Sequence, residues 1–493
     1  MQKGIVIGAG IAGIAASIRL AHQGVDVTIY ESNSYLGGKL TAIQNGPYRF
    51  DAGPSLFTMP ALIEDLFQLC NEDPKQHFTY QKKETICNYF WNDGKSYQMP
   101  AGMDNIVESL VHNFDTDPTA VHDYLDRSKL KYEKTAPVFL ERSLHKVSSF
   151  TNMETLSAMA SIPKLGINTT LHEVNKQAFK DEKLVQLFDR YATYNGSSPY
   201  QTPGIMSMIP HLEMGIGTYF PDGGMVNITN SLVALAKRQG VQFLFDTRVD
   251  KILKQNGKAT GIQVGEEEIY ADIIVSNMDV FSTYKHLLPE SDWPKKTLAQ
   301  EQSSSALIFY WGIAKAFPEL SLHNILFSDD YKGEFENIFK SKTILNDPTI
   351  YINISSKSNP TDAPDGCENW FVMINTPGDY GQDWDQMISE AKENIIKKID
   401  AVLNCDIRSY IQTEDILDPR SIQSKTQSHR GALYGTASNN KFAAFLRHSN
   451  FSSKIKNLYF CGGSVHPGGG IPLCLYSAKI VSDLVAKDNG RVT

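Results

Sequence analysis

The sequence predicts an α/β fold with a Rossmann-like domain at its start, and three observations support this prediction. A short apolar run at residues 4–7 is suited to a strand buried on both faces. A helix-compatible run at 14–23 follows and stops at Gly24, the residue type favoured just past a helix end. Residues 25–30 then form a second apolar strand that ends at Glu31. Strand, helix and strand in this order predict the unit from which parallel sheets are built.

The composition is that of an ordinary globular protein. The chain has 493 residues, a formal net charge of −8, 41% hydrophobic residues and 21% charged residues. At roughly 150 residues per domain, this length predicts two to four structural units. Mild acidity argues against a nucleic-acid partner, and six cysteines without a Cys-x-x-Cys pair predict neither a disulfide framework nor a metal site. The most apolar stretch, 5–21, is interrupted by glycines and Arg19, which argues against a transmembrane span.

The turn between the first strand and the helix has the chemistry of a phosphate cradle. It reads Gly8-Ala9-Gly10-Ile11-Ala12-Gly13, a G-x-G-x-x-G pattern. Gly8 permits the tight turn, Gly10 lets a pyrophosphate approach the backbone, and Gly13 lets the helix pack closely on the strand. The helix N-terminus supplies free N–H groups, and Glu31 is placed to accept hydrogen bonds from a ribose. The pattern predicts a bound dinucleotide; the alternative is a glycine-rich structural turn.

Two further turns favour FAD over NAD. Gly37 and Gly38 follow Glu31 closely and precede Lys39, which can neutralise a phosphate oxygen of an extended cofactor; the alternative is a surface turn with a solvated lysine. The run Gly53-Pro54-Ser55-Leu56 forms a turn able to bring backbone against a flat ring, or else a plain loop.

Segments far along the chain supply more of the same architecture. Residues 226–238 predict a helix, 241–253 a strand, and 269–275 another strand that leads into Asn277. Asn256-Gly257 is a hairpin signal between the two strands. In a flavoprotein with two dinucleotide-domain halves, this part returns to cover the adenine.

The C-terminal segment repeats the strand, glycine loop and helix of the N-terminus. Residues 457–461 predict a strand, 462–472 a loop with five glycines, and 473–487 a helix with Pro472 in its first turn. Five glycines ahead of a helix are costly in chain entropy, which argues against a loop without a ligand. The positive end of this helix dipole is suited to negative charge that builds on a flavin during reduction.

Together these residues resemble the bacterial-type phytoene desaturase family of carotenoid oxidoreductases. The resemblance covers essentially the whole chain and is most specific in the closing run Gly463-Ser464-Val465-His466-Pro467-Gly468-Gly469-Gly470-Ile471-Pro472. Ser464-Val465, Leu473-Cys474-Leu475 and the run 430–435 look more like the 1-hydroxycarotenoid 3,4-desaturases within that family.

The resemblance implies the fold of the amine oxidase and GDI-like flavoproteins, in three parts. We expect an FAD-binding domain from residues 1–90, 216–285 and 455–493, an α+β substrate domain from 286–454, and a helical lid or membrane-contact subdomain from 91–215. It also implies FAD without NAD, with oxygen or a quinone as the electron acceptor. The implied cofactor contacts are Gly8, Gly10, Ile11, Ala12, Gly13, Glu31, Gly38, Lys39, Ser55, Leu56, Val249, Asn277, Gly463, Gly470 and Ile471.

The expected reaction is the introduction of a C3–C4 double bond into a 1-hydroxylated carotenoid. The hypothesis is hydride transfer from C4 to flavin N5, followed by loss of a proton from C3, with no catalytic residue assigned. Candidate polar groups are Asp51, Arg430, Tyr434 and His466, although a loop histidine hydrogen-bonded to backbone is the favoured interpretation of His466.

A carotenoid substrate is insoluble in water, so we expect a cytoplasmic protein peripherally associated with the inner face of the cell membrane. The helical runs expected at 154–160 and 183–194, with the apolar loop 205–209, are candidates for the lid and membrane contact; the alternative is that they are ordinary core faces of a helical subdomain. Strands expected at 303–311 and 370–375 are candidates for lining a substrate tunnel.

Four other functions remain open at this stage. A phytoene desaturase or a flavin-dependent carotenoid isomerase would share the fold, and only the reaction product distinguishes them. An amine or protoporphyrinogen oxidase would share residues 4–39, with a different C-terminal loop. A binding protein without flavin, like the Rab GDP-dissociation inhibitors, is disfavoured by the intact glycine turn and Glu31.

Overall fold

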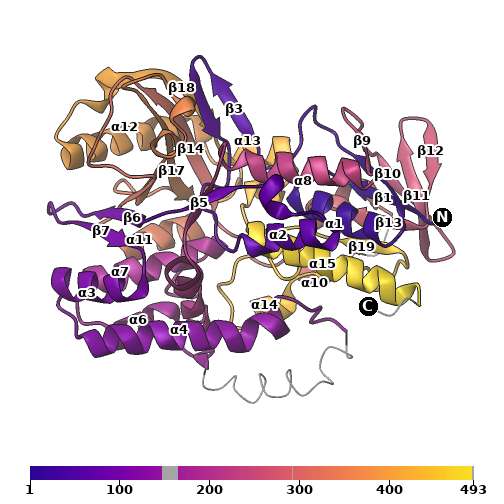
Figure 1. Cartoon of the computed structure of the whole chain (residues 1–493), viewed down its shortest axis with the longest axis horizontal. Coiled ribbons are helices and arrows are strands. Elements are labelled where there is room, and N and C mark those ends of the chain that lie inside the picture. Colours follow the sequence, from indigo (N-terminus) through magenta and orange to yellow (C-terminus); the bar gives the residue numbers. More distant parts are fainter. Residues whose placement is uncertain (147–164, 291–292, 491–493) are drawn as a thin grey trace.

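The chain folds into two lobes, as the computed structural model in Figure 1 shows. A large cavity is lined by residues of both lobes. The structure describes residues 1–146, 165–290 and 293–490. The N-terminal strands, the C-terminal helix and a middle segment lie together in one lobe, although they are far apart in the sequence. The second lobe holds a large sheet above a group of helices.

The first lobe contains a five-stranded parallel sheet, as the sequence predicts. Its order is β19 (Leu458–Phe460), β13 (Ile273–Ser276), β1 (Lys3–Ile7), β2 (Asp26–Tyr30) and β9 (Gln242–Leu244). Helices α1 (Ile11–His22), α8 (Val226–Arg238) and α15 (Ile471–Asp488) cover one face. The antiparallel strands β10 (Lys251–Gln255), β11 (Lys258–Val264) and β12 (Glu267–Tyr270) cover the other.

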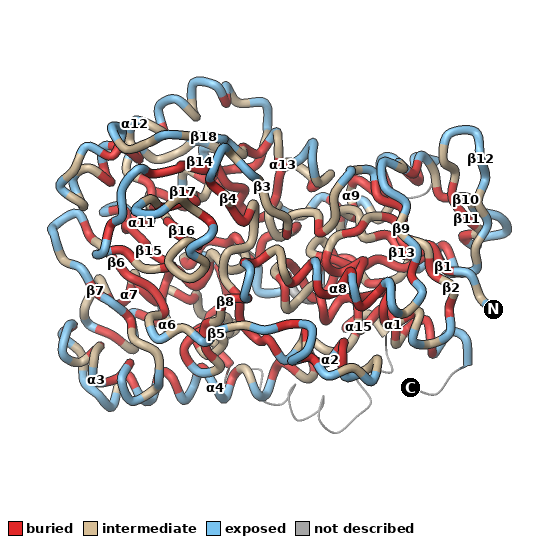
Figure 2. The backbone as a smooth tube through the Cα atoms, turned by 45° about the horizontal axis from the view of Figure 1, so that its top comes forward, coloured by how far each residue is buried: buried red, intermediate tan, exposed pale blue. Residues whose placement is uncertain are grey.

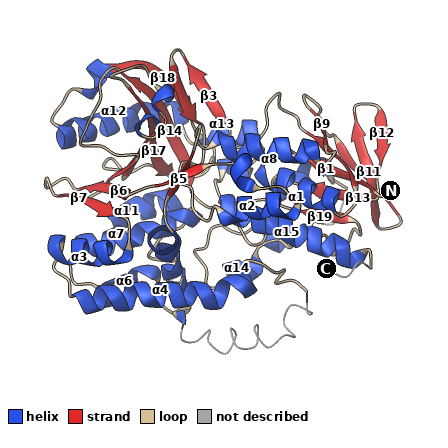
Figure 3. Cartoon of the chain, viewed as in Figure 1, coloured by secondary structure: helices blue, strands red, loops and turns tan. Residues whose placement is uncertain are grey.

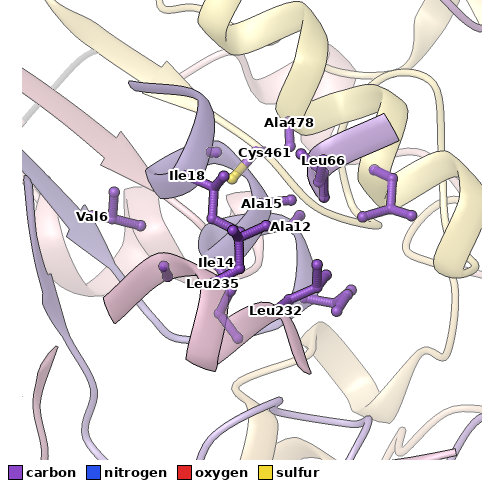
Figure 4. Close-up of a cluster of buried hydrophobic side chains, with 14 of the residues drawn as sticks. Val6, Ala12, Ile14, Ala15, Ile18, Leu66, Leu232, Leu235, Cys461 and Ala478 are labelled. Atoms are coloured by element: carbon purple, nitrogen blue, oxygen red, sulfur yellow. The ribbon is translucent and has the colours of Figure 1, made fainter. Parts of the chain in front are cut away.

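Alternation along β1 assigns its side chains to these two layers. Val6 packs with Ile14 and Leu232 on the helical side, where Figure 4 shows the three side chains in one cluster. Ile5 and Ile7 belong to the cluster on the side of β10 and β11. Both faces of the strand are therefore buried, which explains its continuous apolar sequence.

The second lobe is built on a seven-stranded mixed sheet. Its order is β18 (Ile411–Leu417), β14 (Ser305–Ile313), β17 (Glu368–Thr376), β16 (Ile350–Ile354), β15 (His323–Leu326), β6 (Thr85–Phe90) and β7 (Ser96–Pro100). Phe309 and Trp311 pack against Ile395 of α12 (Trp384–Leu403) on one face. Ile308 and Tyr310, which alternate with them, face the central cavity instead. Figure 2 shows that burial is concentrated along the strands of the two large sheets, while loops carry most exposed residues.

The helical group below this sheet consists of α3 (Met103–Asn113), α4 (Pro118–Phe139), α6 (Leu171–Ala178) and α7 (Glu182–Asp189). The run expected at 183–194 forms α7 followed by the 3-10 segment Arg190–Asn195. The expected apolar loop at 205–209 is largely the 3-10 segment Gly204–Met208. The helix expected at 154–160 lies outside the described residues.

The smaller elements connect these layers. They are β3 (Ala42–Asn45), β4 (Tyr48–Asp51), α2 (Ala61–Leu69), β5 (Tyr80–Lys82), β8 (Tyr219–Pro221), α9 (Val280–Ser282), α10 (Lys295–Leu298), α11 (Tyr331–Glu336), α13 (Pro419–Thr426) and α14 (Ala443–Leu446). Among the described residues, none of the helices is long and apolar enough to cross a membrane.

Two strands expected from the sequence are each divided in the structure. The run 241–253 forms β9 in the parallel sheet and the start of β10 in the antiparallel layer, with a non-strand segment at 245–250 between them. The run 269–275 is likewise split at Ala271 and Asp272, where the chain leaves β12 and enters β13. In both cases the chain crosses from one layer to the other, and each segment continues as a strand in its own sheet.

The division into three parts remains a prediction. Strand β6 ends at residue 90, where the first part was expected to end, and β7 follows it; both pair within the seven-stranded sheet. A division that follows the strands would therefore move the first boundary to about residue 84.

Candidate functional site

A single large cavity joins the glycine-rich turns of the first lobe to one face of the seven-stranded sheet. Its volume is about 1250 Å³. It is lined by Gly8 and Gly10 from the β1–α1 turn, by Gly463 and Gly470 from the C-terminal loop, and by Ile308 of β14. The two ends of the chain and the middle of the sequence therefore meet around one space.

The β1–α1 turn is held open by its glycines. Gly8 has a φ of +95° and donates its N–H to Tyr30 O at 2.8 Å, which ties the turn to β2. A Cβ at Gly10 would lie 2.7 Å from Asn277 Oδ1, and a Cβ at Gly13 would lie 2.4 Å from Gly8 O. Ile11 and Ala12 line the cavity with Gly8 and Gly10, whereas Gly13 does not. Gly13 instead allows α1 to approach the turn, which is the packing role expected for it.

Glu31 is fixed at the end of β2 by backbone donors. Its Oε2 accepts from Ala9 N at 2.7 Å, and its Oε1 accepts from Asn33 N at 2.9 Å and Asn33 Nδ2 at 2.8 Å. The carboxylate is buried and lines the cavity. An acceptor held in this way at the end of the second strand suits the hydroxyls of a ribose.

Lys39 lines the cavity between the two glycine-rich regions. Its Nζ donates to Ala432 O and to Leu433 O, each at 3.0 Å. Burial lowers the pKa of Lys39 to about 8, against the opposing effects of Asp279 and Cys474. An anion in the cavity would stabilise the charged form of this lysine, as expected for a side chain that faces a diphosphate.

The C-terminal loop presents the N-terminus of an 18-residue helix to the same space. Gly470 precedes α15 with a φ of +103°, and no side chain caps the helix. A Cβ at Gly470 would meet no atom within 4 Å, and both Gly470 and Ile471 line the cavity. An uncapped helix N-terminus beside a cavity favours negative charge.

The other expected contacts also surround the cavity. These residues are Gly38, Ser55, Leu56, Val249, Asn277 and Gly463. Apart from Gly13, every residue expected to contact the cofactor therefore lines one continuous space.

Sequence reasoning missed Arg447, a buried cation at this end of the cavity. Its Nη1 donates to Tyr434 O at 3.1 Å and Gly463 O at 3.4 Å, and its Nη2 donates to Thr436 O at 2.6 Å. Among the described residues it forms no ion pair, and burial lowers its pKa to about 10. A buried charge without a counter-ion is costly, and an anionic ligand would offset that cost. A lone arginine in a loop gives no signal in the sequence.

Together these features fit a dinucleotide. The cavity supplies a glycine cradle at Gly10, a fixed carboxylate at Glu31, and two cations at Lys39 and Arg447. Within the part of the chain that the structure describes, no group of three or more His, Cys, Asp or Glu residues could hold a metal ion.

The other end of the cavity is formed mainly by apolar side chains. Ile308, Ile325, Phe371 and Met373 line it from three strands of the seven-stranded sheet. Met206, Met208 and Leu212 contribute from the helical group. This end fits a long apolar molecule.

A buried ion pair closes part of this apolar end. Arg190 pairs with Glu213 and also donates to Tyr89 Oη at 2.6 Å. Glu213 accepts in addition from the hydroxyls of Tyr191 and Tyr194. The charges of this cluster are balanced within the protein, unlike that of Arg447.

Of the four polar candidates named from the sequence, only Tyr434 lines the cavity. Asp51 accepts from Arg49 and from the backbone N–H groups of Met225 and Val226 at the start of α8. Arg430 lies over the Tyr380 ring, 4.1 Å from its centroid. His466 Nε2 bonds to Arg142 O at 2.9 Å, which is the backbone role considered for it. These three side chains act in structure rather than at the cavity.

Comparisons with known proteins agree with this geometry. Residues 11–486 match the family model described as flavin containing amine oxidoreductase. The chain is 57% identical over 489 residues to the 1-hydroxycarotenoid 3,4-desaturase of Flavobacterium sp. (strain P99-3), covering 99% of this chain and 100% of that protein. It is 32% identical over 512 residues to the phytoene desaturase of Fusarium fujikuroi, covering 99% and 89%.

Solved structures confirm the fold. Cyclohexylamine oxidase from Brevibacterium oxydans IH-35A superposes with a TM-score of 0.63 at 15% identity, covering 99% of this chain and 100% of that one. An oxidoreductase from Methanosarcina mazei gives 0.61 at 16% identity, covering 98% and 100%. The predictions of an amine oxidase-like fold, of a flavin cofactor and of oxidoreductase activity are thereby confirmed. The chain belongs to the flavin-containing amine oxidoreductase family, among relatives that include carotenoid desaturases.

Proposed function

We propose that the protein is an FAD-dependent 1-hydroxycarotenoid 3,4-desaturase. The observation that carries the proposal is the single cavity, in which an anion-binding glycine region opens directly onto an apolar sheet face. The identity of 57% over the full length of a 1-hydroxycarotenoid 3,4-desaturase supports this choice among the reactions that the fold accommodates.

In this proposal the residues of the first lobe hold the cofactor. Its diphosphate and flavin lie against the turn Gly8–Gly13, against Lys39 and against the start of α15. Its ribose lies against Glu31. When bound, FAD would supply the acceptor for the hydride that leaves C4 of the substrate, and the proton of C3 would pass to solvent. One C–H bond breaks at each carbon, a C=C bond forms, and two electrons pass to the cofactor.

The protein's own contribution is to orient the substrate and exclude water. Ile308, Phe371 and Met373 provide an apolar floor for the polyene, and Tyr434 stands where this floor meets the C-terminal glycine loop. Burial raises the pKa of Tyr434 to about 12, so its ring stays neutral beside the substrate. Such positioning accounts for catalysis without an assigned base.

We also propose that the protein collects its substrate from the cytoplasmic face of a membrane and passes its electrons to oxygen or a quinone. Phe442 and Leu446 are 53% and 45% exposed, and the neighbouring Lys441 lines the cavity together with Phe139 at the end of α4. Exposed apolar groups beside a cavity mouth suit contact with lipid. A Phe442→Asp/Leu446→Asp variant should then sediment with anionic lipid vesicles less than the wild type.

The direct test is anaerobic incubation of the FAD-loaded protein with a 1-hydroxylated carotene in liposomes. We expect the flavin absorption to bleach, the carotenoid band to shift to the red and the carotenoid to lose two hydrogens by mass spectrometry. A band shift without a change in mass would instead identify a carotenoid isomerase. Conversion of phytoene in preference to the hydroxylated substrate would identify a phytoene desaturase.

A further inference from the structure

Besides the Arg190–Glu213 ion pair, the apolar end of the cavity contains a second connected set of polar groups. Tyr351 Oη lies 2.8 Å from Ser55 Oγ and 2.7 Å from His323 Nδ1. All three residues line the cavity, and His323 and Tyr351 lie on the neighbouring strands β15 and β16. Apolar side chains such as Ile325 and Phe371 line the cavity beside this set.

The hydrogen bonds around His323 fix which ring nitrogen carries the proton. Asn353 Nδ2 donates to Leu322 O at 2.9 Å, which orients its amide, and the same nitrogen lies 3.2 Å from His323 Nδ1. Nδ1 must therefore accept. Burial lowers the pKa of His323 to about 3, so the ring is neutral and its one proton lies on Nε2.

That Nε2–H group has no hydrogen-bond partner among the described residues. His323 lines the cavity but is only 2% exposed, so this N–H group is shielded from bulk water. A buried donor without an acceptor is unfavourable, and such exceptions in a folded protein are expected to have a reason. A ligand oxygen that enters the cavity beside His323 would remove the penalty.

The proposed substrate requires its hydroxyl-binding group to lie near the cofactor. The hydroxyl carbon C1 is three C–C bonds of about 1.5 Å from C4, so the oxygen stays within roughly 6 Å of the carbon that gives up the hydride. His323 is two hydrogen bonds away from Ser55, which is expected to contact the cofactor. An anchor at this place holds C3 and C4 near the cofactor.

We propose that His323 recognises the tertiary alcohol of the substrate by donating Nε2–H to its oxygen. Asn353 and Tyr351 position the ring for this bond. The inference rests on the proposed desaturase function and adds to it the residue that selects hydroxylated over unhydroxylated polyenes. It makes His323 a specificity-determining residue without any role in breaking C–H bonds.

The test compares two substitutions on two substrates. His323→Leu removes the donor, whereas His323→Gln keeps an N–H group at similar reach. Each purified, FAD-loaded variant is assayed with a 1-hydroxylated carotene and with the same carotene lacking the hydroxyl. For His323→Leu we expect kcat/KM for the hydroxylated substrate to fall about ten-fold or more, mainly through KM, while the value for the other substrate does not fall. His323→Gln should retain most of the wild-type preference.

A matched control guards against a purely structural effect. His448 is also a buried histidine whose pKa is lowered, to about 4, and it does not line this cavity. His448→Leu should leave the preference between the two substrates unchanged even where it lowers stability. Flavin content and Tm, measured for every variant, show whether the fold is retained.

The outcomes separate the two proposals. Wild-type protein that converts neither carotene refutes the desaturase function itself. Wild-type protein that prefers the hydroxylated carotene, with a His323→Leu variant that keeps this preference, refutes the role of His323 alone. Equal losses on both substrates in His323→Leu also refute it, because they indicate a general packing role.

Discussion

Each end of the cavity has a buried guanidinium group, and its charge is neutralised by a carboxylate at one end but not at the other. At the substrate end, Arg190 is neutralised by Glu213 and donates to Tyr89 as well. At the cofactor end, Arg447 donates only to backbone oxygens, such as those of Tyr434 and Thr436. A balanced site suits a neutral ligand, and an unbalanced positive site suits an anion. The difference indicates which end takes the apolar substrate and which takes the diphosphate of the cofactor.

The largest expected effect is the loss of FAD binding at the cofactor end of the cavity. In Gly13→Ala the new Cβ would lie 2.4 Å from Gly8 O and 2.9 Å from Asn277 Oδ1, so α1 has to move away from the turn. We expect FAD affinity to fall at least about 100-fold, because the helix N-terminus no longer meets the diphosphate. Flavin content after purification and FAD titration by fluorescence measure this loss.

Gly24→Asn is the matched control for that variant. Gly24 has a φ of +82°, which asparagine tolerates better than other side chains, and a Cβ there meets no atom within 4 Å. Its flavin content should equal that of the wild type. Full flavin content in Gly13→Ala would show that close packing at this turn is dispensable.

Substituting each arginine by methionine sharpens the comparison directly. Arg190→Met leaves Glu213 buried without its cation, so we expect the free energy of unfolding to fall by about 3–5 kcal/mol. Arg447→Met leaves no carboxylate behind, so a smaller loss of stability should accompany a roughly ten-fold weaker affinity for FAD. Denaturant unfolding of the apoproteins and FAD titration give the two quantities. Equal stability losses, with unchanged FAD affinity in Arg447→Met, would contradict the electrostatic difference between the ends.

The smallest expected effect is a pH dependence of FAD binding that originates at Lys39. Burial lowers the pKa of this lysine to about 8 in the protein without ligand. Its charge attracts the diphosphate, so affinity should be highest below pH 8 and should decline above it, by at most ten-fold per pH unit. Fluorescence titrations from about pH 6.5 to 9.5 follow this decline. Lys39→Arg should flatten it, since arginine keeps its charge throughout that range; a slope unchanged in Lys39→Arg would assign it to another group.

The elements and expected contacts of the cofactor-binding lobe could be predicted because they depend on short sequence motifs. The glycine turns, the position of Glu31 and the helix bounds of α8 follow from residues that are adjacent in the sequence. The strands β14 and β17 were also expected, because both runs are rich in apolar and aromatic residues, and in the structure both are almost wholly buried. Local sequence patterns predict a strand or helix well where its side chains all pack within one layer of the fold.

The features that escaped prediction depend on contacts between distant segments. Nothing in the run 241–253 marks the residue at which the chain leaves the parallel sheet, because both β9 and β10 are apolar enough to be strands. His323 and Tyr351 are single polar residues in separate strands, and only the pairing of β15 with β16 brings them together. The environment of Arg447 is formed by backbone carbonyls from two different loops, so it cannot be read from the residues next to Arg447 in the sequence.

The order of strands in the parallel sheet has a consequence for biosynthesis. The central strand of this sheet, β1, begins at Lys3, whereas the edge strand β19 begins at Leu458. At about 5–20 residues per second, a ribosome needs roughly 20–90 s to pass from the first to the last of these strands. During that time the β1–α1 turn has no contact with the C-terminal glycine-rich loop and is accessible to chaperones and proteases. Capture of the flavin is therefore expected only after translation has ended, and a chain cut short before Leu458 should accumulate as apoprotein.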